Sequence, residues 1–254
     1  MLELNKVYLG DCLEVMRYIE SGSVDLILSD LPFGSTKCKW DTPIDLKQLW
    51  LEYERVIKFN GAILLFAQVP FDKVLGASNL NMLRYEWIWE KTQATGYQNA
   101  KKMPMKAHEN ILVFYKKLPI YNPEKTSGHV RKVSSAKNRI ECVKRTNALD
   151  DYLYGKDNIQ KIETYDSTER YPRSVLKFKS DKQTCVLHPT QKPVALLEYL
   201  IKTYTNVGDL VLDNCVGSGS TCVAAINTKR QFLGIEKEEK YFDIAKERIE
   251  RKLN

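Results

Sequence analysis

The chain has 254 residues, which is enough for one large α/β domain or for one domain that carries a sizeable insertion. Hydrophobic residues make up 43% and charged residues 28% of it, as in ordinary globular proteins, and no apolar run is long enough to cross a bilayer. We therefore expect no membrane segment and a cytoplasmic location. The six cysteines form no CxxC pair and the three histidines lack metal-ligand spacing, so we also expect reduced thiols and no metal site.

The first part of the chain alternates between predicted strands and helices. Residues 7–11 predict a short strand ending in Gly-Asp, and residues 12–19 have helical spacing. Residues 24–28 form an apolar run that is typical of a strand buried on both faces of a parallel sheet. A helix is predicted over 43–59, with Pro43 in its first turn and Asn60-Gly61 as its C-cap.

The pattern continues to residue 115. Residues 62–67 predict another apolar strand, 70–80 a helix, 83–90 an alternating strand and 111–115 the next strand. This sequence of strands and helices favours one mostly parallel sheet.

The positive charge is concentrated in the middle of the chain. Residues 91–149 hold 13 Lys/Arg and 3 acids, a local charge of +10, whereas the whole chain carries +7. Such a block suits a polyanion such as nucleic acid, and a solvated lysine-rich insertion explains it equally well. Residues 116–187 lack sustained periodicity in their first half, so we interpret them as an inserted module that is functional or disordered.

Regular patterns return after this module. Thr190 is the expected N-cap of a helix over 191–204, and 209–213 predict a strand. A glycine-rich turn follows at 214–220, and then a helix of small residues over 221–229. Residues 232–236 predict the last strand and 240–251 an amphipathic terminal helix.

Two strand ends carry candidate site residues. The strand at 24–28 stops at Ser29 and is followed by Asp30, Leu31, Pro32 and Phe33. An acid, a proline and an aromatic side chain after a buried strand belong at the crevice where open α/β sheets bind ligands. Asp11 follows the first predicted strand in the same way, although taken alone it is better explained as a helix cap.

The turn at 211–221, VLDNCVGSGST, is a candidate cofactor loop. Gly217 and Gly219 allow a ligand close to the backbone, and the helix behind them offers free N–H groups. A P-loop would need a lysine that is absent, and a dinucleotide fingerprint would need glycine where Cys222 stands. We therefore favour S-adenosylmethionine, with Glu236 at the end of the following strand as the acid that grips the ribose hydroxyls.

Three motifs together carry a resemblance to a known family. DLPF (30–33), HPTQKP (188–193) and DNCVGSGST (213–221), in this order, resemble the adenine-N6 and cytosine-N4 DNA methyltransferases, in the group whose catalytic tetrapeptide precedes the donor-binding loop. The resemblance implies a Rossmann-like methyltransferase fold, with a mostly parallel seven-stranded sheet, helices on both faces and an inserted DNA-recognition region. It divides the chain into a catalytic half (1–115), a basic target-recognition region (116–187) and a cofactor-binding half (188–254).

The resemblance also assigns roles to individual residues. The catalytic positions are Asp30, Leu31, Pro32 and Phe33, where leucine and phenylalanine stand in place of the family's usual proline and tyrosine. The cofactor-binding positions are Asp11, Cys12, Lys192, Asp213, Asn214, Cys215, Gly217, Ser218, Gly219, Ser220 and Glu236, with Lys192 near the carboxylate end of the donor. We expect Lys37, Lys39, Lys101, Lys102 and Lys106 to contact nucleic acid.

The expected activity is methylation of adenine N6 in duplex DNA, on a base flipped out of the helix. Cytosine-N4 methylation, RNA methylation and a catalytically silent DNA-binding protein with a retained cofactor pocket are the alternatives. The expected partners are double-stranded DNA, a cognate restriction endonuclease and a second copy of the chain. Two geometric conditions follow: Asp30 and Gly217 must line one cavity, and strand 232–236 must lie beside strand 7–11.

Overall fold

The computed structural model describes residues 2–34, 41–134, 165–181 and 191–253. The chain forms two compact units, one made of Met1–Asn122 with Arg173–Asn254 and the other of Pro123–Pro172. The larger unit contains the three motif regions, apart from the part of HPTQKP that lies outside the described residues.

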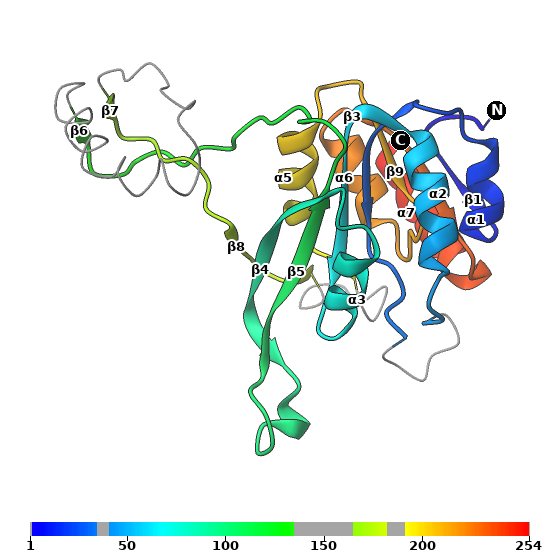
Figure 1. The fold of residues 1–254 in the computed structure, drawn as a ribbon, viewed down its shortest axis with the longest axis horizontal. Coiled ribbons are helices and arrows are strands. Elements are labelled where there is room, and N and C mark those ends of the chain that lie inside the picture. The colour runs from blue at the N-terminus through cyan, green and yellow to red at the C-terminus, as the bar shows by residue number, and fades with distance from the viewer. Residues whose placement is uncertain (1, 35–40, 135–164, 182–190, 254) are drawn as a thin grey trace. The chain divides into compact units, whose positions relative to one another are not determined.

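An eight-stranded sheet forms the centre of the larger unit (Figure 1). Its strands are β1 (Lys6–Leu9), β2 (Val24–Ser29), β3 (Ile57–Ala67), β4 (Leu83–Thr95), β5 (Lys106–Phe114), β8 (Val175–Phe178), β9 (Leu210–Asp213) and β10 (Gln231–Glu236). They lie in the order β1-β10-β9-β2-β3-β5-β4-β8. Among its described strands only β5 runs antiparallel to its neighbours, β3 and β4, so the sheet is mostly parallel, as predicted. The strand β8, from within 116–187, brings the number from the expected seven to eight.

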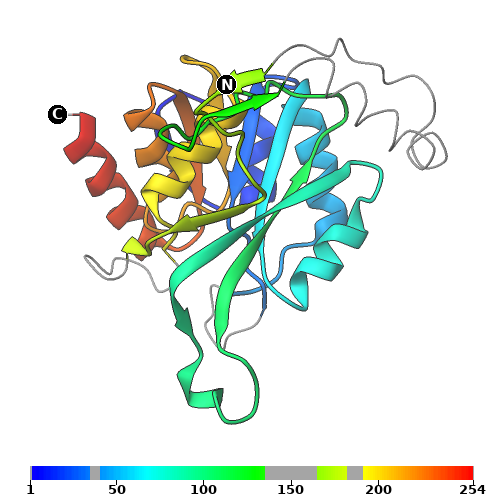
Figure 2. The same ribbon diagram turned by 90° about the vertical axis from the view of Figure 1, so that its left-hand side faces the viewer.

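Helices cover both faces of the sheet, as the resemblance implies. On one face lie α1 (Cys12–Val15) with the 3₁₀ turn η1 (Met16–Tyr18), α2 (Leu46–Val56) and α3 (Phe71–Ser78), and on the other α5 (Val194–Tyr204), α6 (Ser220–Asn227) and α7 (Glu239–Leu253) (Figure 2). Alternate strand residues point to opposite faces, so Leu28 packs toward the second group and Ile27 toward the first. In the described part of the chain, no helix has the length and apolar character needed to span a membrane.

The prediction for the ends of α2 was wrong. The helix begins after Asp45, whose carboxylate accepts hydrogen bonds from the N–H groups of the first turn, and not at Pro43. It stops at Val56 because Ile57 already pairs with Val24 of β2. The Asn60-Gly61 pair, expected as a C-cap, therefore lies inside β3. There a Cβ at position 61 would lie 2.9 Å from the carbonyl oxygen of Asp25, so glycine is needed for close packing rather than for helix termination.

The start of α5 also differs from the prediction. The helix begins at Val194 with Pro193 as its N-cap, and Gln191 and Lys192 precede it in extended chain. The carboxylate of Asp181 accepts the Val194 N–H at 2.9 Å, a contact that local periodicity does not reveal. The expected cap, Thr190, lies outside the described residues.

Strands from the two ends of the chain lie side by side. β1 and β10 pair in parallel, with Leu9 opposite Glu236, which confirms the second geometric condition. β9 joins this pair to β2 through parallel pairing of Val211 with Leu26. The carboxyl ends of β1, β10, β9 and β2 therefore meet at one edge of the sheet, which is where α/β folds bind ligands.

A long hairpin made by β4 and β5 projects from this same edge (Figure 2). Asn110 of β5 lies opposite Ala67, the last residue of β3, so the residues of β5 before it lie beyond the end of β3. The short 3₁₀ turn η2 (Tyr97–Asn99) is at the tip. The exposed residues between Thr95 and Lys106 thus lie beyond the carboxyl edge of the parallel strands.

The smaller unit is built around a two-stranded antiparallel sheet of β6 (Lys132–Ser134) and β7 (Tyr165–Ser167). The guanidinium of Arg131 binds both carboxylate oxygens of Asp166, at 2.7 and 2.5 Å. Arg170 donates to the backbone oxygens of Val130 and Ser167. These contacts hold the two described segments of this unit together.

Candidate active site

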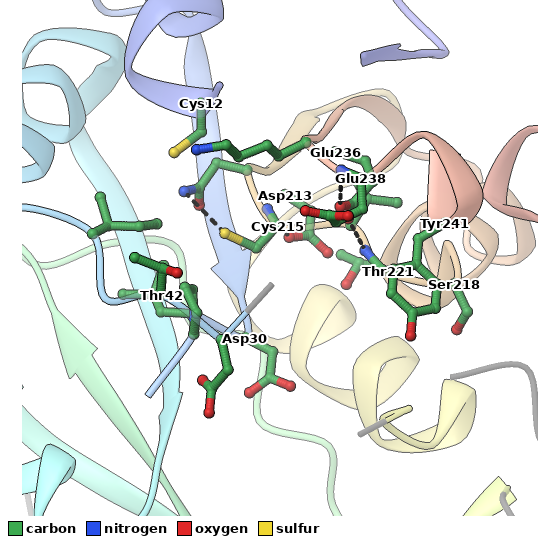
Figure 3. A pocket seen from close by; sticks show the side chains of 18 of the residues that line it. Cys12, Asp30, Thr42, Asp213, Cys215, Ser218, Thr221, Glu236, Glu238 and Tyr241 are labelled. Atoms are coloured by element: carbon green, nitrogen blue, oxygen red, sulfur yellow. Dashed lines mark hydrogen bonds between the residues drawn. The ribbon is translucent and has the colours of Figure 1, made fainter. Parts of the chain in front are cut away.

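A cavity of about 350 Å³ lies at the carboxyl edge of the sheet (Figure 3). Asp30 and Gly217, far apart in the sequence, both line it, which confirms the first geometric condition. The predicted site residues that line the cavity are Asp11, Cys12, Asp30, Leu31, Pro32, Phe33, Lys192, Asp213, Asn214, Cys215, Gly217, Ser218, Ser220 and Glu236. Such a volume is in the usual range for small-molecule sites.

Of the other predicted site residues, those that the structure describes do not line the cavity. Gly219 is the N-cap of α6, with φ of +81°, and a Cβ there would lie 3.2 Å from the Cα and Cβ of Ala245. Its glycine is thus explained by backbone conformation and by helix packing. Lys101, Lys102 and Lys106 are exposed on the hairpin, and Lys37 and Lys39 lie outside the described residues.

Asp30 stands at the end of β2 in a largely buried position. Its Oδ2 accepts a hydrogen bond from Nζ of Lys192 at 2.5 Å. Among the described residues its Oδ1 has no hydrogen-bond partner, although that atom is shielded from solvent. Burial raises the pKa of Asp30 to about 6, against the opposing effect of Lys192. An N–H donor brought into this cavity would satisfy the unpaired oxygen and favour the carboxylate.

Lys192 lies between two carboxylates. Besides Asp30, its ammonium contacts Oε2 of Glu109 at 3.2 Å, and Glu109 binds Nζ of Lys91 at 2.6 Å through its other oxygen. Burial alone would lower the pKa of Lys192, but Asp30 and Glu109 outweigh it and raise that pKa. The sequence predicted Lys192 at the site but not these partners. Glu109 was missed, although an acid two residues before the apolar strand residues 111–115 was a signal for it.

Phe33 and Leu31 differ in exposure. Leu31 is buried, so its side chain anchors the tetrapeptide in the core, while Phe33 is only partly buried. The Phe33 ring stacks on Phe71 of α3, with centroids 5.1 Å apart and an angle of 28° between the rings. Phe71, which sequence reasoning missed, thus fixes the orientation of the Phe33 ring at the cavity wall.

Asp213 begins the glycine-rich turn and is tied down by its neighbours. Its Oδ1 accepts hydrogen bonds from the Ser29 hydroxyl at 2.9 Å and from the Cys215 N–H at 3.1 Å, and Thr221 donates a further one. Burial nevertheless raises its pKa to about 6. Through Ser29, this bond network joins the turn directly to the strand that carries Asp30.

The side chain of Asn214 is held by a hydrogen bond from α2. The buried hydroxyl of Tyr53, on α2, donates to its Oδ1 at 2.6 Å, and its Nδ2 lies 3.6 Å from Sγ of Cys215. From the sequence, Tyr53 was placed only within the helix predicted over 43–59. Its second role emerges only from the tertiary structure, because the two residues are 161 positions apart.

Arg248 of α7 supports the other side of the turn. Its Nη1 donates to the carbonyl oxygen of Ser218 and to the Ser220 hydroxyl, both at 3.0 Å. From the sequence, the terminal helix was predicted only as amphipathic, and this contact was missed. Together with Tyr53, Arg248 fixes the turn from both flanks.

Glu236 and Asp11 occupy neighbouring strand ends. The Oε2 of Glu236 accepts the Gly217 N–H at 2.7 Å and its Oε1 accepts the Glu238 N–H at 2.9 Å. Burial raises the pKa of Glu236 above its ordinary value. Asp11 caps α1 through the Leu13 N–H and pairs with Lys237 at 3.1 Å, so the helix-cap interpretation is confirmed.

The cavity is strongly acidic. Of the residues that the structure describes, seven with carboxylates and two lysines line it, and Figure 3 shows Asp30, Asp213, Glu236 and Glu238 around the same space. The acids are Asp11, Asp30, Asp41, Asp45, Asp213, Glu236 and Glu238, and the bases are Lys192 and Lys237. Such a lining fits a ligand that carries positive charge and hydroxyl groups, as a sulfonium nucleoside does. Within the described residues no group of three or more His, Cys, Asp or Glu side chains is arranged to hold a metal ion.

The chain as a whole is similar to proteins of known activity and to solved structures. The DNA adenine methyltransferase YhdJ of Escherichia coli (strain K12) is 30% identical over 261 residues, which cover 98% of this chain and 83% of that protein. Among solved structures, the fold is similar to that of the M1.HpyAVI–SAM complex, with a TM-score of 0.63, 23% identity and 98% of each chain covered. It is also similar to the cytosine-N4-specific PvuII DNA methyltransferase, with a TM-score of 0.62, 16% identity and 97% and 90% of the two chains covered.

The structural neighbours share the fold of this chain, a mostly parallel α/β sheet covered by helices. The sequence profile of the N6/N4 DNA methylase family matches residues 24–247, from the strand before Asp30 to the terminal helix. The chain therefore belongs to the DNA methylase family of N6/N4 amino-group methyltransferases.

Proposed function

We propose that this DNA methyltransferase moves a methyl group from S-adenosylmethionine to N6 of an adenine flipped out of duplex DNA. The observation that carries the proposal is Asp30 at the cavity, with one carboxylate oxygen bound by Lys192 and the other without a partner among the described residues. An exocyclic amine has two N–H groups to offer to such a site, and it is otherwise a weak nucleophile.

In this proposal the DLPF segment holds and activates the base. One N–H of the amine binds the Asp30 carboxylate and the other binds the Leu31 carbonyl, which localises the nitrogen lone pair. Phe33, fixed by Phe71, stacks on the flipped base. Alignment then supplies most of the rate enhancement, because the methyl group is already bound to a sulfonium. As the N–C bond forms and the S–C bond breaks, the amine proton leaves through Asp30 to water.

The glycine-rich turn is the proposed donor site. Glu236 would accept the ribose hydroxyls, and the turn that begins at Asp213 would hold the methionine end. The acidic lining favours the positive sulfonium. The site thus separates two tasks, since the base binds at the end of β2 and the donor at the ends of β9 and β10.

Adenine is favoured over cytosine by two observations. The tetrapeptide begins with aspartate, which resembles the adenine enzymes of the family more than the cytosine ones. The YhdJ relative, an adenine methyltransferase, is 30% identical, whereas the cytosine-N4-specific neighbour is 16% identical.

The nucleoside product tests this choice. After incubation of the protein and donor with unmethylated duplex DNA, enzymatic digestion and mass spectrometry are expected to show N6-methyldeoxyadenosine. A parallel reaction with RNA is expected to give no methylated nucleoside. N4-methyldeoxycytidine would support the cytosine alternative, and the absence of any product from a folded, donor-binding protein would support the silent DNA-binding one.

We further propose that the β4–β5 hairpin contacts DNA beside the cavity. Its exposed lysines lie beyond the carboxyl edge from which Asp30 is presented, where phosphates of a bound duplex would pass. The region 116–187 would read the sequence, with the strands β6 and β7 as its described framework. A cognate restriction endonuclease and a homodimer stay predictions.

Neutralising the hairpin is expected to weaken DNA binding in a salt-dependent way. The triple variant Lys101→Ala, Lys102→Ala, Lys106→Ala should lower the slope of log K against log salt by about 2–3, because each lost phosphate contact removes about 0.9. Fluorescence anisotropy with a labelled duplex at several salt concentrations measures this slope. The matched control replaces Lys202, Lys246 and Lys252, which are exposed on α5 and α7. Equal slopes for the two triple variants would contradict a role for the hairpin.

A further inference from the structure

Two buried charged residues near Asp30 do not line the cavity. Glu109, on β5, and Lys91, on β4, have side chains that are only 7% and 9% exposed. Nζ of Lys91 contacts Oε1 of Glu109 at 2.6 Å. Neither residue is assigned any part in binding the donor or the base.

These two residues continue a line of alternating charges that ends at the cavity. From Lys91 to Glu109, from Glu109 to Lys192 and from Lys192 to Asp30 the contacts are 2.6, 3.2 and 2.5 Å. Removing four charges from water is costly, and well-packed apolar residues of similar size usually stabilise a core as well or better. Stability alone therefore does not account for this line of charges, whose last member is the proposed catalytic carboxylate.

We propose that Glu109 is a positioning residue for methyl transfer: through Lys192 it fixes the carboxylate of Asp30, with Oδ2 held and Oδ1 left for the amino group of the base. The inference rests on the proposed function of Asp30 and adds to it a residue outside the cavity.

Glu109 can have this role because its carboxylate fixes the position of the Lys192 ammonium. The ammonium of Lys192 contacts a carboxylate on each side and lies 5.0 Å from the centre of the Phe66 ring. A lysine side chain has several rotatable bonds, so a single anchor leaves it mobile. Without Glu109 the lysine would keep Asp30 as its partner but lose its fixed position, and Asp30 would lose the alignment on which transfer depends.

The charges around Asp30 give this role a specific signature. Within the described part of the chain, three charged groups face its carboxylate: Lys192 from the segment before α5, Glu109 from β5 and Asp213 from β9. Glu109 and Asp213 raise the pKa of Asp30, and Lys192 lowers it. Removing Glu109 should therefore let Asp30 ionise at lower pH, and removing Lys192 should have the opposite effect. A residue that only supported the fold would reduce activity without moving the pH profile.

The test compares the pH dependence of kcat in the full-length wild-type protein and the Glu109→Gln variant, with donor and DNA saturating. For Glu109→Gln we expect kcat at pH 8 to fall about tenfold, as when a group that orients a reacting ligand is removed. The acid limb should move to lower pH by about one unit. The KM for the donor should change less than twofold. The Lys192→Gln variant should move the acid limb to higher pH.

A matched control and a second variant complete the experiment. Glu90 of β4 pairs with Lys177 of β8 at 3.1 Å on an exposed surface, so Glu90→Gln should leave kcat and its pH profile unchanged. If Glu109→Gln fails to fold, the double variant Lys91→Met, Glu109→Gln takes its place, because it removes one charge of each sign. The acid limb of its pH profile should also move to lower pH. An acid limb that stays in place or moves upward overturns the inference.

The same assay separates this inference from the proposed function. An Asp30→Asn protein that retains activity would refute the role of Asp30 itself. An inactive Asp30→Asn protein together with a Glu109→Gln protein that behaves like Glu90→Gln would refute only the role of Glu109.

Discussion

Replacing Asp30 with Asn is expected to slow methyl transfer by about 10²- to 10³-fold, the size of effect seen when one hydrogen-bonding group that stabilises a transition state is removed. The substitution keeps the shape of the side chain, and the amide oxygen still accepts from Lys192. The position of Oδ1 is then occupied by an NH₂ group, which cannot accept a hydrogen bond from the amine of the base. Transfer of a radiolabelled methyl group to duplex DNA measures the rate.

Binding and folding should survive this change. Donor affinity by calorimetry and DNA affinity by anisotropy are expected to stay close to the wild-type values, because most of the proposed contacts to the donor and the DNA come from residues other than Asp30. Burial raises the pKa of Asp30 to about 6, so the contribution of this group to stability is lost as the pH rises through that value. At pH 8 the Asn variant should therefore melt at no lower temperature than the wild type. Activity within tenfold of the wild type would contradict the role of Asp30.

Replacing Glu236 with Gln is expected to weaken donor binding by about 10- to 100-fold, since hydrogen bonds to a charged group contribute about 1.5–3 kcal/mol. The carboxylate accepts the Gly217 N–H through one oxygen and the Glu238 N–H through the other. Glutamine can keep only one of these bonds and has one oxygen fewer for the ribose hydroxyls. Calorimetric titration with the donor measures the affinity.

The effect on turnover distinguishes donor binding from catalysis. With saturating donor, kcat of the Glu236→Gln protein should stay within about threefold of the wild type, since its contacts belong to binding rather than to the reacting atoms. Glu239→Gln, at an exposed position three residues away, is the matched control and should bind the donor normally. A normal donor affinity for Glu236→Gln would remove Glu236 from the proposed site.

Local sequence predicted most strands and the strand ends that line the cavity. The apolar runs that became β2, β3 and β9 were recognisable because strands buried on both faces have continuous hydrophobic sequence. Helix ends were less predictable. The end of α2 is set by pairing of Ile57 with Val24, and the start of α5 by a hydrogen bond from Val194 to Asp181. Both depend on residues far away in the sequence, so no local pattern contains them.

The sequence by itself determined the family, the order of its motifs and the strand ends at which Asp30, Asp213 and Glu236 stand. This follows because the residues of each motif are neighbours along the chain. Only the tertiary structure decided what these side chains contact. Lys192 meets Asp30 across 162 positions, and Glu109 meets Lys192 because β5 runs antiparallel to β3 beside the site. Such contacts follow from strand order and register, which short-range patterns do not specify.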